Sequence, residues 1–240
     1  MVITPKKCYN PSTESFIGQI TFSNEKDNAT HALVFMLIGI ASRWKHVVGY
    51  HFTGNSFNSK TLKEIIFQII NKTENIGFRV NFITSDMGPG NTRLWRLLGI
   101  STDRFSKITN CITHPFDHNR YLYIIADPPH IFKNLKQTLI TNHDITIPNN
   151  IVFKYNLLSN KVELRHFNEL LDIQENSELL LTPKLKKNDI NCSNNFNKMR
   201  VSKAAHVFSN DVSSSLQLLA HYNNKPEYLT TAWFIKIVRK

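Results

Sequence analysis

The side chain with the clearest chemical potential in this sequence is Asp86. It follows residues 78–84 (FRVNFIT), which alternate in polarity as a strand would, and it begins a turn that contains Gly88 and Gly90. A carboxylate at the tip of a strand can join other carboxylates in holding two Mg²⁺ ions, one activating the attacking oxygen and one stabilising the leaving oxygen. The plainer alternative is an aspartate that hydrogen-bonds the backbone of its own turn. Spacing alone favours that alternative.

A second group of polar residues begins at Asp127, directly after the apolar segment 121–126. Asp127 suits the N-cap of a helix, because the prolines that follow it tolerate the first helical turn. His130 and Lys133 lie one turn apart on this predicted helix, and with the helix N-terminus they form a candidate phosphate site. A histidine there more often caps or packs. The sequence contains no Gly-x-x-x-x-Gly-Lys-Ser/Thr string, which excludes a P-loop.

These residues need a sheet with flanking helices to position them. Strands are predicted at 15–22, 33–40, 47–52, 78–84 and 121–126. The run 33–40 (LVFMLIGI) is continuously apolar, as in a strand buried on both faces. The strand order predicts an α/β fold with a mixed sheet, and 47–84 suits a parallel crossover.

Helices are expected between and after these strands. Apolar residues recur at helical spacing from Leu62 to Ile70, with Ser59, or the pair Thr61 and Glu64, as the start signal. Residues 94–98 form a short helix. Beyond Asp127 the pattern is mainly helical, with helices expected from Asp127, at 163–171, 199–222 and 230–238, and a polar loop at 184–197. The change near Asp127 predicts two domains, 1–126 and 127–240.

Composition limits the classes of function. The net charge is +11, spread as +6 over residues 1–126 and +5 over the remainder, which favours a polyanionic partner such as nucleic acid. The longest apolar run, 32–41, is about half the length of a bilayer span, so no membrane association is expected. Cys8, Cys111 and Cys192 lie far apart, without the pairing of a zinc ribbon or a disulfide framework, which suits a reducing compartment.

Several stretches, in the same order along the chain, resemble P-element-type transposases, including the vertebrate relatives that carry a THAP DNA-binding finger. The most specific is 127–134 (DPPHIFKN). The other matching stretches are 1–7, 9–11, 16–18, 32–50, 84–88 with Asn91, 94–100, 198–201, 204–209 and 231–235.

The resemblance implies an RNase H-like core that is interrupted after 121–126 by a mainly helical GTP-binding insertion. Asp86 matches the second of three metal-holding acids. The first acid precedes the methionine that matches Met1, and the last lies beyond Lys240, so the first strand of the core and the end of the insertion are expected to be truncated. Asp127, His130 and Lys133 match the string that opens the insertion. The residues that read guanine are not assigned.

The resulting expectation is a fragment of a cut-and-paste DNA transposase that uses Mg²⁺ and GTP in its full-length form. Its expected partners are transposon-end DNA, GTP and a homo-oligomeric copy, and its expected location is the nucleus. Because one carboxylate cannot position two metal ions, we predict no cleavage by this chain alone. Two alternatives remain: a domesticated, non-enzymatic module that binds nucleic acid or protein, and a stand-alone GTP-binding regulator.

Overall fold

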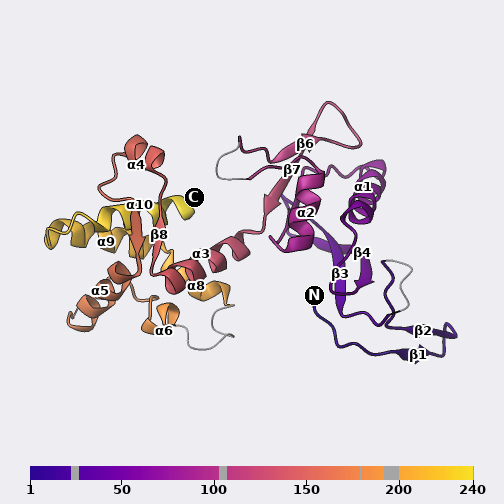
Figure 1. Ribbon diagram of the computed structural model, residues 1–240, viewed down its shortest axis with the longest axis horizontal. Coiled ribbons are helices and arrows are strands. Elements are labelled where there is room, and N and C mark those ends of the chain that lie inside the picture. The colour runs from indigo at the N-terminus through magenta and orange to yellow at the C-terminus, as the bar shows by residue number, and fades with distance from the viewer. Residues whose placement is uncertain (23–26, 103–106, 179, 192–199, 240) are drawn as a thin grey trace. The chain divides into compact units, whose positions relative to one another are not determined.

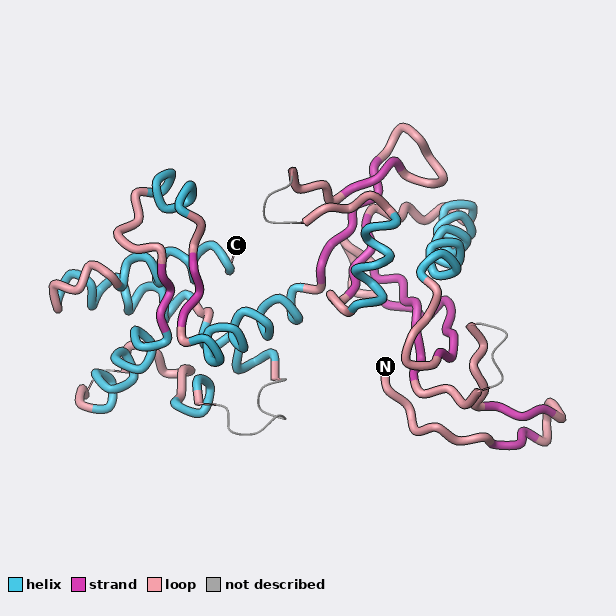
Figure 2. The backbone as a smooth tube through the Cα atoms, viewed as in Figure 1, coloured by secondary structure: helices cyan, strands magenta, loops and turns pink. Residues whose placement is uncertain are grey.

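The computed structural model describes residues 1–22, 27–102, 107–178, 180–191 and 200–239. The chain forms two compact units, Met1–Ile125 and Ala126–Lys240. Figure 1 shows most of the strands in the first unit and most of the helices in the second. Figure 2 shows the same division by secondary structure. No described helix is both long enough and apolar enough to cross a bilayer.

The first unit is a mixture of strands and helices. Its elements are β1 (Cys8–Asn10), β2 (Ser15–Ile17), β3 (His31–Ile38), β4 (Lys45–Thr53), α1 (Ser59–Asn75), β5 (Phe82–Ser85), α2 (Pro89–Leu97), β6 (Cys111–Thr113) and β7 (Tyr121–Ala126). The strands form the antiparallel pairs β1–β2 and β3–β4 and a sheet in the order β5-β7-β6. The α/β class is therefore confirmed.

Within the mixed α/β fold that the sequence predicts, the described strands β3–β4 and β5-β7-β6 form two separate sheets. The crossover predicted over 47–84 consequently connects two sheets and does not return to its own. The strands predicted at 15–22 and 78–84 are also shorter, at Ser15–Ile17 and Phe82–Ser85. Alternation in polarity marked the extended segments, but hydrogen-bonded partners decide how much of each becomes a strand.

The apolar run at 33–40 does not form a strand buried on both faces. In β3, Val34, Met36 and Ile38 are exposed by 43%, 45% and 67%, and they alternate with half-buried residues. Only one face of the β3–β4 pair is covered among the described residues. The apolar side chains on the other face of β3 therefore stay exposed, although the sequence predicts burial on both faces.

Helix α1 begins at Ser59, one of the two expected start signals. The N-cap itself is Asn58, whose side-chain oxygen accepts a hydrogen bond of 2.8 Å from the Lys60 backbone N–H. The predicted start at Ser59 is therefore confirmed, and the alternative start at the Thr61–Glu64 pair is wrong. Leu62 and Ile70 bury the inner face of the helix, which brings the helix against the sheet residues of the unit.

The second unit is mainly helical, as predicted. Its elements are α3 (Pro128–Asn142), β8 (Asp144–Thr146), α4 (Asn149–Tyr155), β9 (Lys161–Glu163), α5 (Leu164–Glu175), α6 (Lys187–Ile190), α8 (Val201–Val207), α9 (Asn210–Tyr222) and α10 (Tyr228–Val238). The sequence did not predict the β8–β9 hairpin or α4. One apolar core joins α3, α5, α8, α9 and α10, and Phe167, Phe208, Val212 and Leu216 are fully buried in it.

The helix predicted at 199–222 is two helices, α8 and α9, which are separated at Phe208 and Ser209. Ser209 is the N-cap of α9, and its Oγ accepts a hydrogen bond of 3.3 Å from the Val212 backbone N–H. The apolar period continues through the break, which is why spacing alone did not reveal it. Met199, and residues 192–197 of the predicted loop, lie outside the described residues.

Replacing Ser209 with alanine is expected to lower the stability of the second unit by about 1 kcal/mol, because the N-terminus of α9 loses its capping oxygen. The Ser214→Ala variant is a matched control, since Ser214 is exposed within the same helix. Urea unfolding of both variants measures the difference. Equal midpoints would contradict the capping role.

Candidate functional site

Asp86 lies directly after β5, where the chain turns into α2. Its Oδ1 accepts hydrogen bonds from the Gly88 backbone N–H and from Asn91 Nδ2, both at 2.8 Å. A Cβ at Gly88 would come within 2.9 Å of this oxygen, so a side chain there would displace the Asp86 carboxylate. The carboxylate is thus oriented by its own turn, as the plainer alternative proposed, and also by a side chain of α2. Asn91 is one of the residues that carry the family resemblance, but its bond to Asp86 was not predicted.

A pocket of about 250 Å³ opens beside the exposed Asp86. Met1, His31, Asn55 and Arg93 are among the residues that line it, and in the described part of the chain Asp86 is its one carboxylate. The strand β3 and the helix α2 therefore supply polar groups around the predicted catalytic residue.

The donor set at this pocket does not fit a pair of divalent metal ions. Mg²⁺ prefers several oxygen ligands in near-octahedral geometry, and a two-metal site needs more than one carboxylate. Among the described residues, no group of three or more His, Cys, Asp or Glu side chains is placed to hold a metal. No catalytic step through a metal follows from this chain, and the role of Asp86 as a metal ligand stays a prediction.

The structure brings Asp127 and His130 together at the beginning of α3. Asp127 is in the N-cap position, but its carboxylate bonds to the Nδ1 of His130. Lys133 is half-buried one turn further along the helix. The N-cap position of Asp127 is therefore confirmed, but its side chain makes no capping hydrogen bond to the helix N-terminus. A carboxylate at a helix N-terminus also opposes a phosphate there by like charge. The nucleotide-binding role of the three residues stays a prediction.

Two hollows in the second unit have a size that could suit part of a nucleoside triphosphate. The larger, of about 330 Å³, is lined by β8, α4 and α10 through residues such as Ile145, Tyr155 and Trp233, and its lining contains no charged residue. The smaller, of about 260 Å³, includes Lys187, whose Nζ already pairs with Glu175 at 2.6 Å. The larger hollow has no cation for phosphates, and in the smaller one the carboxylate of Glu175 lies beside Lys186 and Lys187, which opposes a triphosphate there.

Comparison with known proteins decides the family. A family model described as "TNP-like, RNase H N-terminal domain" matches residues 1–99, and one described as "TNP-like, GTP-binding insertion domain" matches residues 130–240. The "Transposable element P transposase" of Drosophila melanogaster is 28% identical over 201 residues, which cover 83% of this chain and 24% of the relative. The chain belongs to the P-element-type transposase family.

A second relative of this transposase chain is the human "DNA transposase THAP9", which is 22% identical over 96% of the chain and 25% of its own length. A solved structure, "Drosophila P element transposase strand transfer complex", aligns with a TM-score of 0.75 at 24% identity, covering 99% of this chain and 47% of that chain. The likeness to this structure concerns the fold. The transposase chain spans about a quarter of the length of these curated relatives.

The matches confirm the resemblance that the sequence strings indicated. They also confirm an RNase H-like α/β part followed by a GTP-binding insertion domain.

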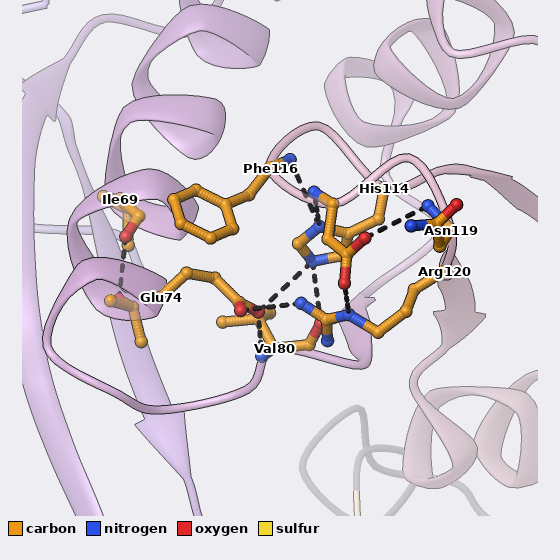
Figure 3. Close-up of polar contacts among 9 residues, drawn as sticks. Ile69, Glu74, Val80, His114, Phe116, Asn119 and Arg120 are labelled. Carbon is orange, nitrogen blue, oxygen red and sulfur yellow. Dashed lines mark hydrogen bonds and ion pairs between the residues drawn. The ribbon is translucent and has the colours of Figure 1, made fainter.

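A connected polar cluster in the described part of the first unit lies away from Asp86, and the sequence did not predict it (Figure 3). Arg120 Nη2 donates to Glu74 Oε2 at 2.6 Å, and Arg120 Nε donates to Asp117 Oδ2 at 2.9 Å. Glu74 Oε1 accepts from the Val80 backbone N–H at 2.7 Å. The cluster therefore ties the end of α1 to the segment before β5 and to the β6–β7 turn. Hereafter it is called the Glu74 cluster.

His114 completes the Glu74 cluster as a buried side chain whose two ring nitrogens both make hydrogen bonds. Its Nδ1 accepts from the backbone N–H groups of Phe116 and Asp117 at 3.2 and 3.3 Å. This assigns the ring hydrogen to Nε2, which donates to the Val80 carbonyl oxygen at 3.0 Å. Glu74 and Arg120 are 46 positions apart in the sequence, so no local motif could have signalled the cluster.

The Glu74 carboxylate stays ionised although its side chain is only 5% exposed. Burial by itself would raise the pKa of Glu74, but the hydrogen bonds from the Val80 N–H and from Arg120, together with the charge of Arg120, lower this pKa below its ordinary value of 4.5. The cluster is a structural support for the sheet that carries Asp86.

Proposed function

We propose that this chain supplies the part of a P-element-type transposase that holds DNA beside Asp86, and that it does not cut DNA by itself. The observation that carries the proposal is the exposed carboxylate of Asp86, oriented at the end of β5 by Gly88 and Asn91. The chain in which it lies matches an RNase H model and a GTP-binding insertion model in that order.

Charge near Asp86 favours DNA as the partner. Arg93 and Arg96 are exposed on α2, the helix that begins at the Asp86 turn, and Arg93 lines the pocket beside Asp86. The whole chain carries a net charge of +11. Exposed arginines beside a polar pocket suit contacts to phosphate oxygens, which supply most of the sequence-independent affinity for DNA.

The donor set beside Asp86 supports the part of the proposal that concerns cleavage. Asp86 supplies one carboxylate to its pocket in the described part of the chain, so the charge that would hold and activate two metal ions is incomplete. Divalent metal, GTP, a nuclear location and self-association belong to the same proposal, as properties of the longer transposase.

The DNA-binding part is tested by measuring affinity for duplex DNA at several salt concentrations. We expect log affinity to fall linearly with log salt, because bound phosphates release counterions. Arg93→Ala and Arg96→Ala should each reduce the slope by about 1. Lys154→Ala, which removes an exposed charge from the second unit, is the control. An unchanged slope in both arginine variants would contradict DNA contact at α2.

Two further measurements on the same protein separate the alternatives. Incubation of DNA with Mg²⁺ or Mn²⁺ should give no strand cleavage, and turnover that Asp86→Ala abolishes would overturn the proposal. Binding of labelled GTP without any DNA binding would favour a GTP-binding regulator. DNA binding without GTP binding would favour a domesticated nucleic-acid-binding module.

A further inference from the structure

The hairpin of β1 and β2 exposes nearly all of its side chains. Five of its six strand residues are exposed, and the sixth, Asn10, is half-buried. Figure 1 shows the hairpin extending away from the other sheets and the helices of the first unit. A two-stranded hairpin has little stability of its own in water, so local hydrogen bonds have to define its shape.

Polar groups define the turn of the hairpin. Asn10 Oδ1 accepts a hydrogen bond of 3.1 Å from the Ser12 backbone N–H, and the Asn10 carbonyl oxygen accepts one of 3.3 Å from the Thr13 N–H. The hydroxyl groups of Thr13 and Ser15 are hydrogen-bonded at 2.8 Å. Glu14 then takes a left-handed φ of 48°, which completes the reversal of the chain. The turn therefore holds the two strands in register.

Gly18 defines the base of the hairpin. Its φ is +105°, and a Cβ at this position would lie 2.0 Å from the Lys6 carbonyl oxygen, so only glycine allows the two segments to approach this closely. Lys7 lies across from Gly18, with its Cα 3.5 Å from the place of that Cβ. The Gly18 carbonyl oxygen accepts a hydrogen bond of 2.9 Å from the Ala29 N–H, which attaches the hairpin to the rest of the unit.

One face of the hairpin carries two exposed aromatic rings. Tyr9 is directly opposite Phe16 in the strand register, and their ring centroids are 5.3 Å apart with the planes tilted by 60°. The two side chains are 55% and 63% exposed. Because successive side chains alternate between faces, Lys7 falls on the same face as Tyr9, and Gly18 opposite it adds no side chain. Hereafter Lys7, Tyr9 and Phe16 are called the Tyr9 face.

The chemistry of the Tyr9 face fits a nucleotide whose base is unpaired. An exposed ring offers a flat surface on which a base of any sequence stacks, and a neighbouring ammonium group attracts the phosphate. The exposed Lys6 and Lys7 lie at the base of the hairpin, whereas its one acidic residue, Glu14, lies at the turn. Positive charge is therefore concentrated beside the rings at the base. In a duplex the faces of the bases are already stacked on one another, so the rings select a single strand.

We propose that the Tyr9 face binds unpaired nucleotides of a single DNA strand, with bases stacked on Tyr9 and Phe16 and a phosphate beside Lys7. The choice of DNA as the partner rests on the proposed function, but the surface differs from α2, where Arg93 and Arg96 contact duplex phosphates. The two surfaces accept different forms of DNA and are therefore tested separately.

The test measures binding of the whole chain to a fluorescent oligothymidylate of about 15 nucleotides and to a duplex of the same length, by fluorescence anisotropy. Tyr9→Ala and Phe16→Ala should each weaken single-strand binding about tenfold and leave duplex binding unchanged. Tyr9→Phe, which keeps the ring, should bind like the wild type. Lys7→Ala should reduce the salt slope of single-strand binding by about 0.7.

Ile17→Ala is the matched control, because Ile17 is 50% exposed on the opposite face of the same hairpin. It should leave single-strand binding unchanged, which separates loss of stacking from loss of the hairpin. A strand that contains 5-iodouracil should also crosslink to Tyr9 or Phe16 on irradiation, as mapped by mass spectrometry.

Three results would overturn the Tyr9 face as a single-strand site. They are unchanged single-strand affinity in both ring variants, equal loss in Ile17→Ala, and self-association of the chain that Phe16→Ala abolishes without any effect on oligonucleotide binding. The last result would assign the face to a second copy. Duplex binding without single-strand binding would refute the Tyr9 face alone, whereas single-strand binding with an unchanged duplex salt slope in the α2 variants would refute the proposed contact at α2 alone.

Discussion

Replacing Glu74 with alanine is expected to destabilise the first unit by about 3 kcal/mol, because removal of one partner leaves the others of a buried ion pair uncompensated. Arg120 would keep only Asp117, and the Val80 N–H would lose its carboxylate acceptor. Arg120 Nη1 is already buried without a hydrogen-bond partner among the described residues, so the guanidinium has little remaining compensation.

The measurement should resolve the two units, since a single unfolding free energy is not defined for a chain with two cores. Hydrogen exchange of β7, where Leu122 and Ile124 are buried, reports on the first unit. Glu64→Ala is the matched control, because Glu64 is an exposed glutamate on the same helix. Loss of protection at β7 in both variants, or in neither, would contradict the bracing role of Glu74.

The same carboxylate predicts a direction of pH dependence. The pKa of Glu74 is lower in the folded chain than its ordinary value of 4.5, so its ionisation stabilises the first unit at pH values above about 4.5. That contribution is lost as the pH falls through the folded-state pKa. In Glu74→Gln the stability of β7 should depend less on pH over this acid range. A variant with the full wild-type pH dependence would assign the effect to other carboxylates.

Replacing Phe208 with alanine is expected to destabilise the second unit by about 4 kcal/mol, through lost burial and the cavity that remains. Phe208 is fully buried at the break between α8 and α9. Its ring makes edge contacts with Phe132 of α3, at a centroid separation of 6.1 Å, and with Phe234 of α10, at 6.2 Å. One side chain therefore joins four helices.

The readout is hydrogen exchange of α5 and α9, compared with that of β7 in the first unit. In Phe208→Ala, protection from hydrogen exchange should fall in the second unit and persist at β7. Tyr222→Ala removes an aromatic side chain that is 81% exposed at the end of α9. This control variant should leave the protection of both the second unit and β7 unchanged. If Phe208→Ala left α5 unaffected, Phe208 would not be the side chain that joins these helices.

The sequence predicted the features that depend on local periodicity. Strand β7 has the predicted bounds, and α1 begins at one of the expected signals because its apolar residues recur at a helical period. The sequence strings also predicted the family that the comparisons confirm. These successes rest on neighbouring residues, whose spacing is read directly from the chain.

The features that the sequence did not predict depend on distant partners. The neighbouring residues in the sequence do not distinguish Glu74 from the exposed Glu64, because the partners of Glu74 are Val80 and Arg120. The apolar run of β3 indicated burial, but the position of the sheets decides which of its residues are covered. At Phe208 the apolar period continued while the backbone broke, since Ser209 could cap a new helix. The roles of Asp86, Asp127, His130 and Lys133 stay predictions.

The uncovered apolar residues of the strands have a consequence for handling the protein in solution. Besides the β3 residues, Tyr50, Tyr121 and Tyr123 are exposed by 63%, 61% and 44%. Exposed apolar residues of this kind favour self-association of the protein. The net charge of +11 opposes it, because two copies of the chain repel each other. Added salt shortens the reach of that repulsion to about 3 Å at 1 M. The concentrated protein should therefore stay dispersed in dilute buffer and self-associate as the ionic strength rises.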